Sequence, residues 1–116
     1  MEIMQVDHAS VVITDVERSR HFYRDVLGLR EINKPRTFDF TVLWFQLGDT
    51  QVHLLLKHQA DTISPRHFAL RVKDAAQARS ECRAKRLRIE ETTPIPGADR
   101  VFSATGRDAR ACIGGV

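Results

Sequence analysis

The chain has 116 residues, of which 42% are hydrophobic and 28% are charged. These proportions are typical of folded globular proteins and exclude an intrinsically disordered chain, and the length predicts a single domain spanning residues 1–116. The longest apolar runs, such as residues 54–56, are too short to cross a bilayer, and residues 1–6 lack the basic and then apolar pattern of an export signal. We therefore expect a cytoplasmic protein with no membrane partner.

The formal net charge of +3 comes from basic residues spread over the whole chain. The densest basic group is Arg79, Arg83, Lys85, Arg86 and Arg88. No aromatic residues are interleaved with this group and no groove-reading motif is present, so it is interpreted as a solvated helix face and no nucleic-acid partner is expected. Without a secretion signal, the cysteines at positions 82 and 112 are expected to be reduced thiols.

The first half of the chain predicts a strand, a helix and three further strands. Residues 4–14 are rich in β-branched residues and alternate in polarity, which is typical of a half-buried strand. Asp15 can cap a helix that Gly28 terminates. The remaining strands are expected at 29–33, 38–47 and 50–57, the last two joined by a tight turn at Gly48 and Asp49.

The second half repeats this order. His8 followed seven residues later by Asp15 recurs as His67 followed by Asp74, an offset of 59 residues. The sequence predicts a strand over 67–72 and a helix over 75–85 that begins with a capping box of Asp74 and Gln77. Further strands are expected at 87–91, 100–104 and 110–113, with a loop at 94–97. The chain is thus predicted to be an α+β protein with two βαβββ repeats, about 4–58 and 64–116.

Three histidines fall on the more polar faces of their predicted strands. Strand alternation places His8 with Ser10, His53 with Gln51, and His67 with Ala69 and Arg71. The opposite faces carry apolar residues that can pack under helices. Neutral imidazole is the commonest metal ligand, and three ligands on rigid strands with one position left open suit a catalytic metal. We predict a divalent metal ion, which can be zinc, nickel, manganese or iron because three imidazoles suit several of these.

The same residues carry a family resemblance. The stretch from His8 to Leu29, with its Phe-Tyr and Leu-Gly-Leu ending, resembles the opening of vicinal oxygen chelate proteins, which include glyoxalase I, fosfomycin and bleomycin resistance proteins, and extradiol dioxygenases. Residues 44–55 and 66–74 resemble the next two blocks of that superfamily. The resemblance implies two βαβββ units with curved mixed sheets around a metal-binding cavity. It also implies a homodimer, because each unit forms an open half-barrel.

The resemblance further implies that the metal ligands are His8, His53, His67 and the residue at position 112. The family supplies a glutamate there, whereas this chain has Cys112 and lacks the turn that normally precedes the glutamate. Cys112 is interpreted either as a thiolate ligand or as a small apolar residue, and an altered tail after Phe102 is a third possibility. The departure bears on catalysis more than on fold, because a thiol does not replace a carboxylate as proton carrier. No catalytic base is assigned.

Three functions follow from this pattern. The leading one is a metal-dependent glyoxalase-like lyase or isomerase, in which Lewis-acid chemistry acts on two adjacent oxygens of a small substrate. The second is an extradiol-type dioxygenase, for which the carboxylate of a two-histidine, one-carboxylate iron site is missing. The third is a bleomycin-resistance-like protein that binds a small molecule without chemistry. Trp44, Phe40 and Phe38 are expected either to line its apolar pocket or to belong to the core. Retention of a metal separates the enzymes from the binding protein.

Overall fold

A computed structural model gives the fold of the chain. It describes residues 1–35, 41–59, 67–91, 96, 99–103 and 111–115. The chain divides into two compact units, Met1–Asp61 and Thr62–Val116, and each is considered by itself. In the described part of the chain, no helix is long and apolar enough to span a membrane.

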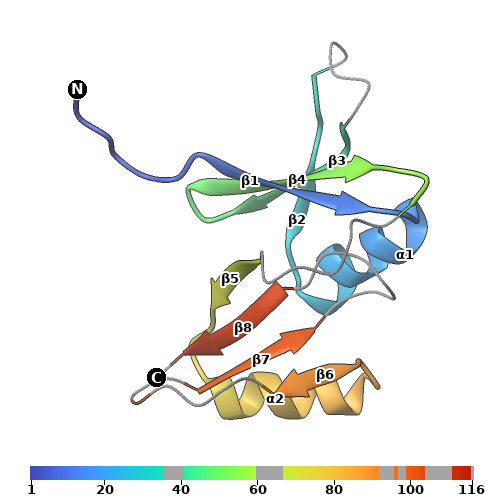
Figure 1. Cartoon of the computed structure of the whole chain (residues 1–116), viewed down its shortest axis with the longest axis vertical. Helices are drawn as coiled ribbons and strands as arrows, with labels where there is room; N and C mark the ends of the chain where they lie inside the picture. The colour runs from blue at the N-terminus through green and yellow to red at the C-terminus, as the bar shows by residue number, and fades with distance from the viewer. Residues whose placement is uncertain (36–40, 60–66, 92–95, 97–98, 104–110, 116) are drawn as a thin grey trace. The chain divides into compact units, whose positions relative to one another are not determined.

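The first unit is a mixed four-stranded sheet with one helical segment (Figure 1). Its strands lie in the order β1-β4-β3-β2, with β1 parallel to β4 and the other neighbours antiparallel. Its elements are β1 (His8–Ile13), α1 (Val16–Arg20), η1 (His21–Val26), β2 (Arg30–Ile32), β3 (Thr41–Leu47) and β4 (Thr50–Leu56).

The helical segment begins and ends where the sequence predicts. The Asp15 side chain accepts a hydrogen bond from the Arg18 backbone amide and so satisfies one of the amides exposed at a helix start. The helix is α-helical through α1 and widens into the π-helical η1, where the Leu27 amide donates to the Phe22 carbonyl five residues earlier. Gly28 then adopts a left-handed φ of 76°, which glycine enters without a steric penalty.

One face of the first sheet forms the core of this unit. Val11, Phe45 and Leu54 come from three adjacent strands and are 5% exposed or less. Tyr23 of η1 stacks on Phe45 with ring centroids 5.7 Å apart, so the helical segment covers this face. Burying an apolar side chain of this size contributes roughly 1.5–3 kcal/mol to folding.

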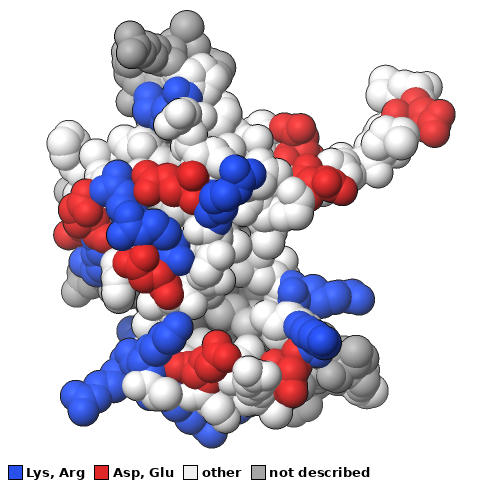
Figure 2. All heavy atoms as spheres, turned by 180° about the vertical axis from the view of Figure 1, so that it is seen from behind, with Lys and Arg blue, Asp and Glu red and all other residues white. Residues whose placement is uncertain are grey.

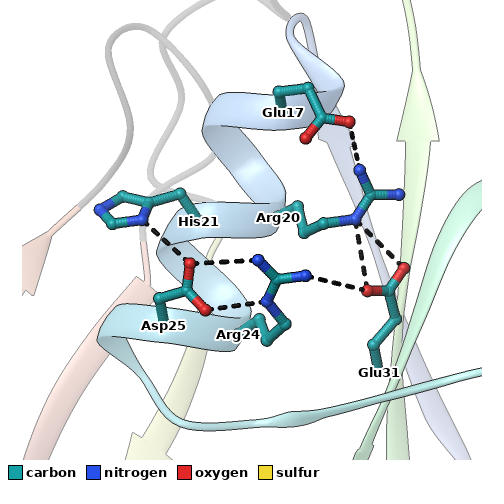
Figure 3. Close-up of polar contacts among 6 residues, drawn as sticks. All are labelled: Glu17, Arg20, His21, Arg24, Asp25 and Glu31. Atoms are coloured by element: carbon teal, nitrogen blue, oxygen red, sulfur yellow. Dashed lines mark hydrogen bonds and ion pairs between the residues drawn. The ribbon is translucent and has the colours of Figure 1, made fainter.

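An ion-pair cluster joins the helical segment to β2 (Figure 3). Arg20 contacts both Glu17 of its own helix and Glu31 of β2, and Arg24 bridges Asp25 and Glu31. Seen from behind, the positive and negative side chains on this face interleave rather than segregate (Figure 2). Each surface pair of this kind contributes little to stability, so the cluster adds few contacts of consequence beside the apolar core.

The second unit has the same order of elements. Its strands lie in the order β5-β8-β7-β6, with β5 parallel to β8 and the other neighbours antiparallel. Its elements are β5 (Phe68–Arg71), α2 (Ala75–Ala84), β6 (Ile89–Glu91), β7 (Asp99–Ser103) and β8 (Ala111–Gly115). The predicted α+β class is therefore confirmed, and each half of the chain carries one βαβββ unit with an open sheet.

Both ends of α2 follow the sequence. The Asp74 side chain accepts from the Gln77 amide, as in a capping box, but the Gln77 side chain donates to Glu81 instead of returning to the cap. At the other end, Arg86 has a left-handed φ of 56°. The Arg86 amide donates to the Arg83 carbonyl and the Leu87 amide to the Cys82 carbonyl, which is the hydrogen-bond pattern of a Schellman motif.

The predicted strand over 4–14 is too long. β1 begins at His8, which pairs with Gln51 near the start of β4. One further backbone hydrogen bond, from the Gln51 amide to the Asp7 carbonyl, joins the two strands just before this pair. Upstream of Asp7 the partner strand has already turned away at residues 48–49, so the apolar side chains of Ile3 and Val6 remain exposed. Strand formation here is limited by the partner, not by propensity.

Candidate functional site

His8 and His53 lie side by side on the first sheet. They come from the adjacent parallel strands β1 and β4, in which Ser10 is the direct partner of His53 and His8 is two residues earlier. The two imidazole rings stack with centroids 4.3 Å apart and planes 18° apart. Two of the four predicted ligands are therefore neighbours in the same unit.

His53 lies between two rings. On the other side of it, Trp44 of β3 is its direct cross-strand partner, and the indole stacks on the imidazole at 3.7 Å with an interplanar angle of 5°. Only 6% of His53 is exposed, whereas the His8 side chain is 44% exposed. The sequence predicted the face that His53 occupies but not its burial.

Hydrogen bonds fix which ring nitrogens carry protons. The Asp7 carboxylate lies 2.9 Å from His8 Nδ1, and the Gln51 Oε1 atom lies 2.8 Å from His53 Nε2. Both oxygens are acceptors, so in the neutral rings these nitrogens donate. The unprotonated nitrogens are then His8 Nε2 and His53 Nδ1, and each ring is oriented by an oxygen in the manner typical of metal-binding histidines.

The environment of His53 favours its neutral form. Burial of the ring, and secondarily the positive charge that His8 can carry, lower the pKa of His53 below its ordinary value. A metal ligand must offer an unprotonated nitrogen. Burial therefore favours the unprotonated form of His53, which is the form that can bind a cation.

The other two predicted ligands belong to the second unit. His67 immediately precedes β5, and Cys112 lies in β8 as the backbone partner of Ala69. The pairing of Ala69 with Cys112 repeats the pairing of Ser10 with His53, since both residues are shifted by 59 positions. Cys112 thus occupies the strand position in its sheet that His53 occupies in the first.

Within each unit taken alone, the described residues contain no group of three His, Cys, Asp or Glu side chains placed to hold a metal. The donor set of the first unit nevertheless fits a transition-metal ion in its chemistry, because two imidazoles from neighbouring strands can each offer a ring nitrogen that is not engaged by the Asp7 or Gln51 oxygen. The other histidines lie elsewhere: His21 bonds Asp25, and His58 follows β4 in an exposed bend.

Sequence reasoning missed the surroundings of His53. Trp44 was expected to line a pocket or join the core, and its stacking partner was not identified. The sequence does contain the information that pairs Trp44 with His53, because a two-residue turn at Gly48 and Asp49 places residue 44 opposite residue 53. Phe38 and Phe40, the other aromatics of the predicted pocket, lie outside the described residues.

A family model described as the glyoxalase/bleomycin resistance protein/dioxygenase superfamily matches residues 5–109. The chain belongs to this superfamily. One relative of this chain is a protein named glyoxylase I 4 from Arabidopsis thaliana, which is 28% identical to it over 74 residues. That alignment covers 64% of this chain and 42% of the relative, so the chain spans less than half of the length of that protein.

Solved structures support the same fold for this member of the superfamily. A glyoxalase-family protein from Bacillus anthracis superposes with a TM-score of 0.87 at 20% identity, covering 99% of this chain and 97% of the other. Lactoylglutathione lyase from Agrobacterium tumefaciens gives 0.79 at 16% identity, covering 98% and 95%. A fosfomycin resistance protein from Mesorhizobium loti gives 0.71 at 20% identity, covering 97% and 91%. At these identities the likeness establishes the fold alone.

Proposed function

We propose that the chain is a metal-dependent, glyoxalase-like enzyme of the lyase or isomerase type that acts on a small substrate with two adjacent oxygens. The observation that carries this proposal is the pair formed by His8 and His53, with their rings 4.3 Å apart. Superfamily membership and a structural neighbour solved with Mn(II), a fosfomycin resistance protein from Listeria monocytogenes, support a divalent metal as the cofactor.

The residues of the first unit have separate roles in this proposal. His8 Nε2 and His53 Nδ1 hold the metal, while Asp7 and Gln51 keep the opposite ring nitrogens protonated. When bound, the metal supplies Lewis-acid chemistry at the substrate oxygens. Trp44 excludes water from one face of His53 by covering it.

His67 and Cys112 are proposed to complete the ligand set. Cys112 stands where a glutamate would serve both as ligand and as base, and its thiol is a poor proton carrier for this chemistry. We therefore expect Cys112→Glu to raise the rate at which lactoylglutathione forms from the hemithioacetal of methylglyoxal and glutathione, with metal content unchanged. Equal turnover in the two proteins would show that a carboxylate at this position does not limit the reaction.

The ligand assignment is tested by metal content. The full chain is purified in chelator-free buffer, loaded with zinc, nickel, manganese or iron(II), and analysed by mass spectrometry for bound metal. We expect one ion per site in the wild type and loss of stoichiometric binding in His8→Ala and His67→Ala. His21→Ala and His58→Ala are the matched controls and should retain the ion.

Several results would overturn the proposal. Retention of the ion by His67→Ala would remove that residue from the ligand set. A wild type that binds none of the four metals, while still binding small aromatic ligands, would favour the non-catalytic binding protein.

We propose that the protein is a homodimer, as the superfamily resemblance implies, and that it is located in the cytoplasm. Analytical ultracentrifugation over a broad concentration range tests it directly. A mass that stays near 13.2 kDa, the mass of one chain, would refute the dimer.

A further inference from the structure

Two arginines flank one glycine on the sheet of the second unit. Gly114 of β8 pairs with Arg71 on the parallel strand β5 and with Arg100 on the antiparallel strand β7. Direct neighbours across a sheet share a face, so both arginines are on the same side, two strand spacings or about 10 Å apart at their Cα atoms. Glycine has no side chain to fill the space between them.

Arg71 lies on the side of this sheet that faces away from α2. Along β5, Phe68 and Leu70 are half-buried, whereas Ala69 and Arg71 are exposed. The helix α2 contacts β7 and β8. Its one buried residue is Cys82, and Ile113 of β8, the neighbour of Gly114, is also buried. Arg71 and Arg100 therefore lie opposite the covered face.

Neither guanidinium is neutralised within the described part of the chain. No hydrogen bond or ion pair of the Arg71 or Arg100 side chain occurs among the described residues, and Arg100 Nε is buried with no hydrogen-bond partner. Other arginines of this unit do have carboxylate partners: Arg79 contacts Glu91, and Arg88 contacts Glu90. A buried, unsatisfied guanidinium N–H is a costly feature that a bound acceptor would relieve.

From this placement we propose that Arg71 and Arg100 form a binding site for an oxyanion, the carboxylate or phosphate group of a small molecule. The guanidinium group offers planar N–H pairs that match the oxygens of either anion, and two of them facing one gap from both sides can hold a single anionic group above Gly114. That the anion is part of the substrate rests on the proposed function; that the site binds an oxyanion does not. The substrate of the enzyme would then be an acid or a phosphate ester.

The test is a calorimetric titration of the full chain with inorganic phosphate, in chloride buffer at low ionic strength. We expect saturable binding to the wild type, and at least a tenfold weaker affinity in Arg71→Gln and in Arg100→Gln. Arg100→Lys keeps the charge and loses the planar N–H pair, so its affinity should fall between those of the wild type and Arg100→Gln. Arg83→Gln, on the exposed side of α2, is the matched control and should bind as the wild type does.

Acetate and succinate titrations decide between the two anion classes, since a carboxylate site would prefer them to phosphate. Circular dichroism establishes that each variant is folded, and Arg71, being exposed, provides a variant that leaves the core intact. Absence of phosphate and carboxylate binding in the wild type, or an equal loss in Arg83→Gln, would overturn the inference. Binding should persist in His8→Ala, so failure of the anion site and failure of the metal site are separate results.

Discussion

Replacing Arg86 by glycine should stabilise the protein. Arg86 follows the helix α2 with a φ of 56°, in the left-handed region that costs a residue with a Cβ roughly 1–2 kcal/mol. Glycine avoids this cost but loses roughly 0.4–1 kcal/mol through the greater freedom of the unfolded chain. The net expectation is a gain of about 0.5–1 kcal/mol, measured as a higher urea midpoint with an unchanged denaturant slope.

The equivalent turn of the first unit provides the opposite change. Gly28 has a φ of 76°, and a Cβ built there would meet no atom within 4 Å. Gly28→Ala should therefore lower the free energy of unfolding by about 1 kcal/mol, because the backbone strain is the one cost that the added methyl group brings. Arg86→Ala is the control, because it removes the charged side chain and keeps the Cβ. If Arg86→Ala stabilises the protein as much as Arg86→Gly does, the effect comes from charge and the backbone argument is refuted.

Three further predictions concern the first unit. Phe45→Ala removes a ring with no exposed surface and should cost about 3–5 kcal/mol in thermal or urea unfolding; a loss below about 1 kcal/mol would contradict the assigned core. The pKa of His53 is lowered by burial, so the unfolded state binds its proton more readily, and metal-free protein should lose stability as pH falls from about 6.5 towards the lowered value. His53→Gln should flatten that part of the stability curve, and an unchanged slope would argue against the buried ring. Hydrogen bonds from Arg24 and then His21 lower the pKa of Asp25 to about 2. The ionised Asp25 carboxylate should therefore stabilise the fold fully above about pH 4, and this contribution should be lost as pH falls through 2. In Arg24→Met, an NMR titration should find a higher pKa for Asp25.

The elements that could be predicted from the sequence are those set by local contacts. Asp15 and Asp74 cap their helices through an amide three residues away, and Gly28 ends the first helical segment through its own φ. The extent of β1 could not be predicted in this way. It depends on the turn at residues 48–49 that precedes β4, and this turn is about 40 residues away in the sequence.

The candidate site shows the same division. Strand alternation was sufficient to put His8 and His53 on polar faces, and the parallel pairing of β1 with β4 makes them neighbours. The turn at Gly48 and Asp49 is enough to place Trp44 opposite His53, but the burial of His53 also requires the His8 ring, and no local pattern gives the register of β1 against β4. Polarity patterns describe one strand at a time, whereas a ring stack requires the register of three.

Trp44 is the only tryptophan in the chain, and it lies in the first unit against His53. The emission of this indole is therefore an intrinsic optical probe of one half of the molecule, and far-ultraviolet circular dichroism reports on both halves. Coincident unfolding curves from the two signals would mean that the halves melt as one cooperative body. Separate curves would measure how far each βαβββ unit is stable in its own right.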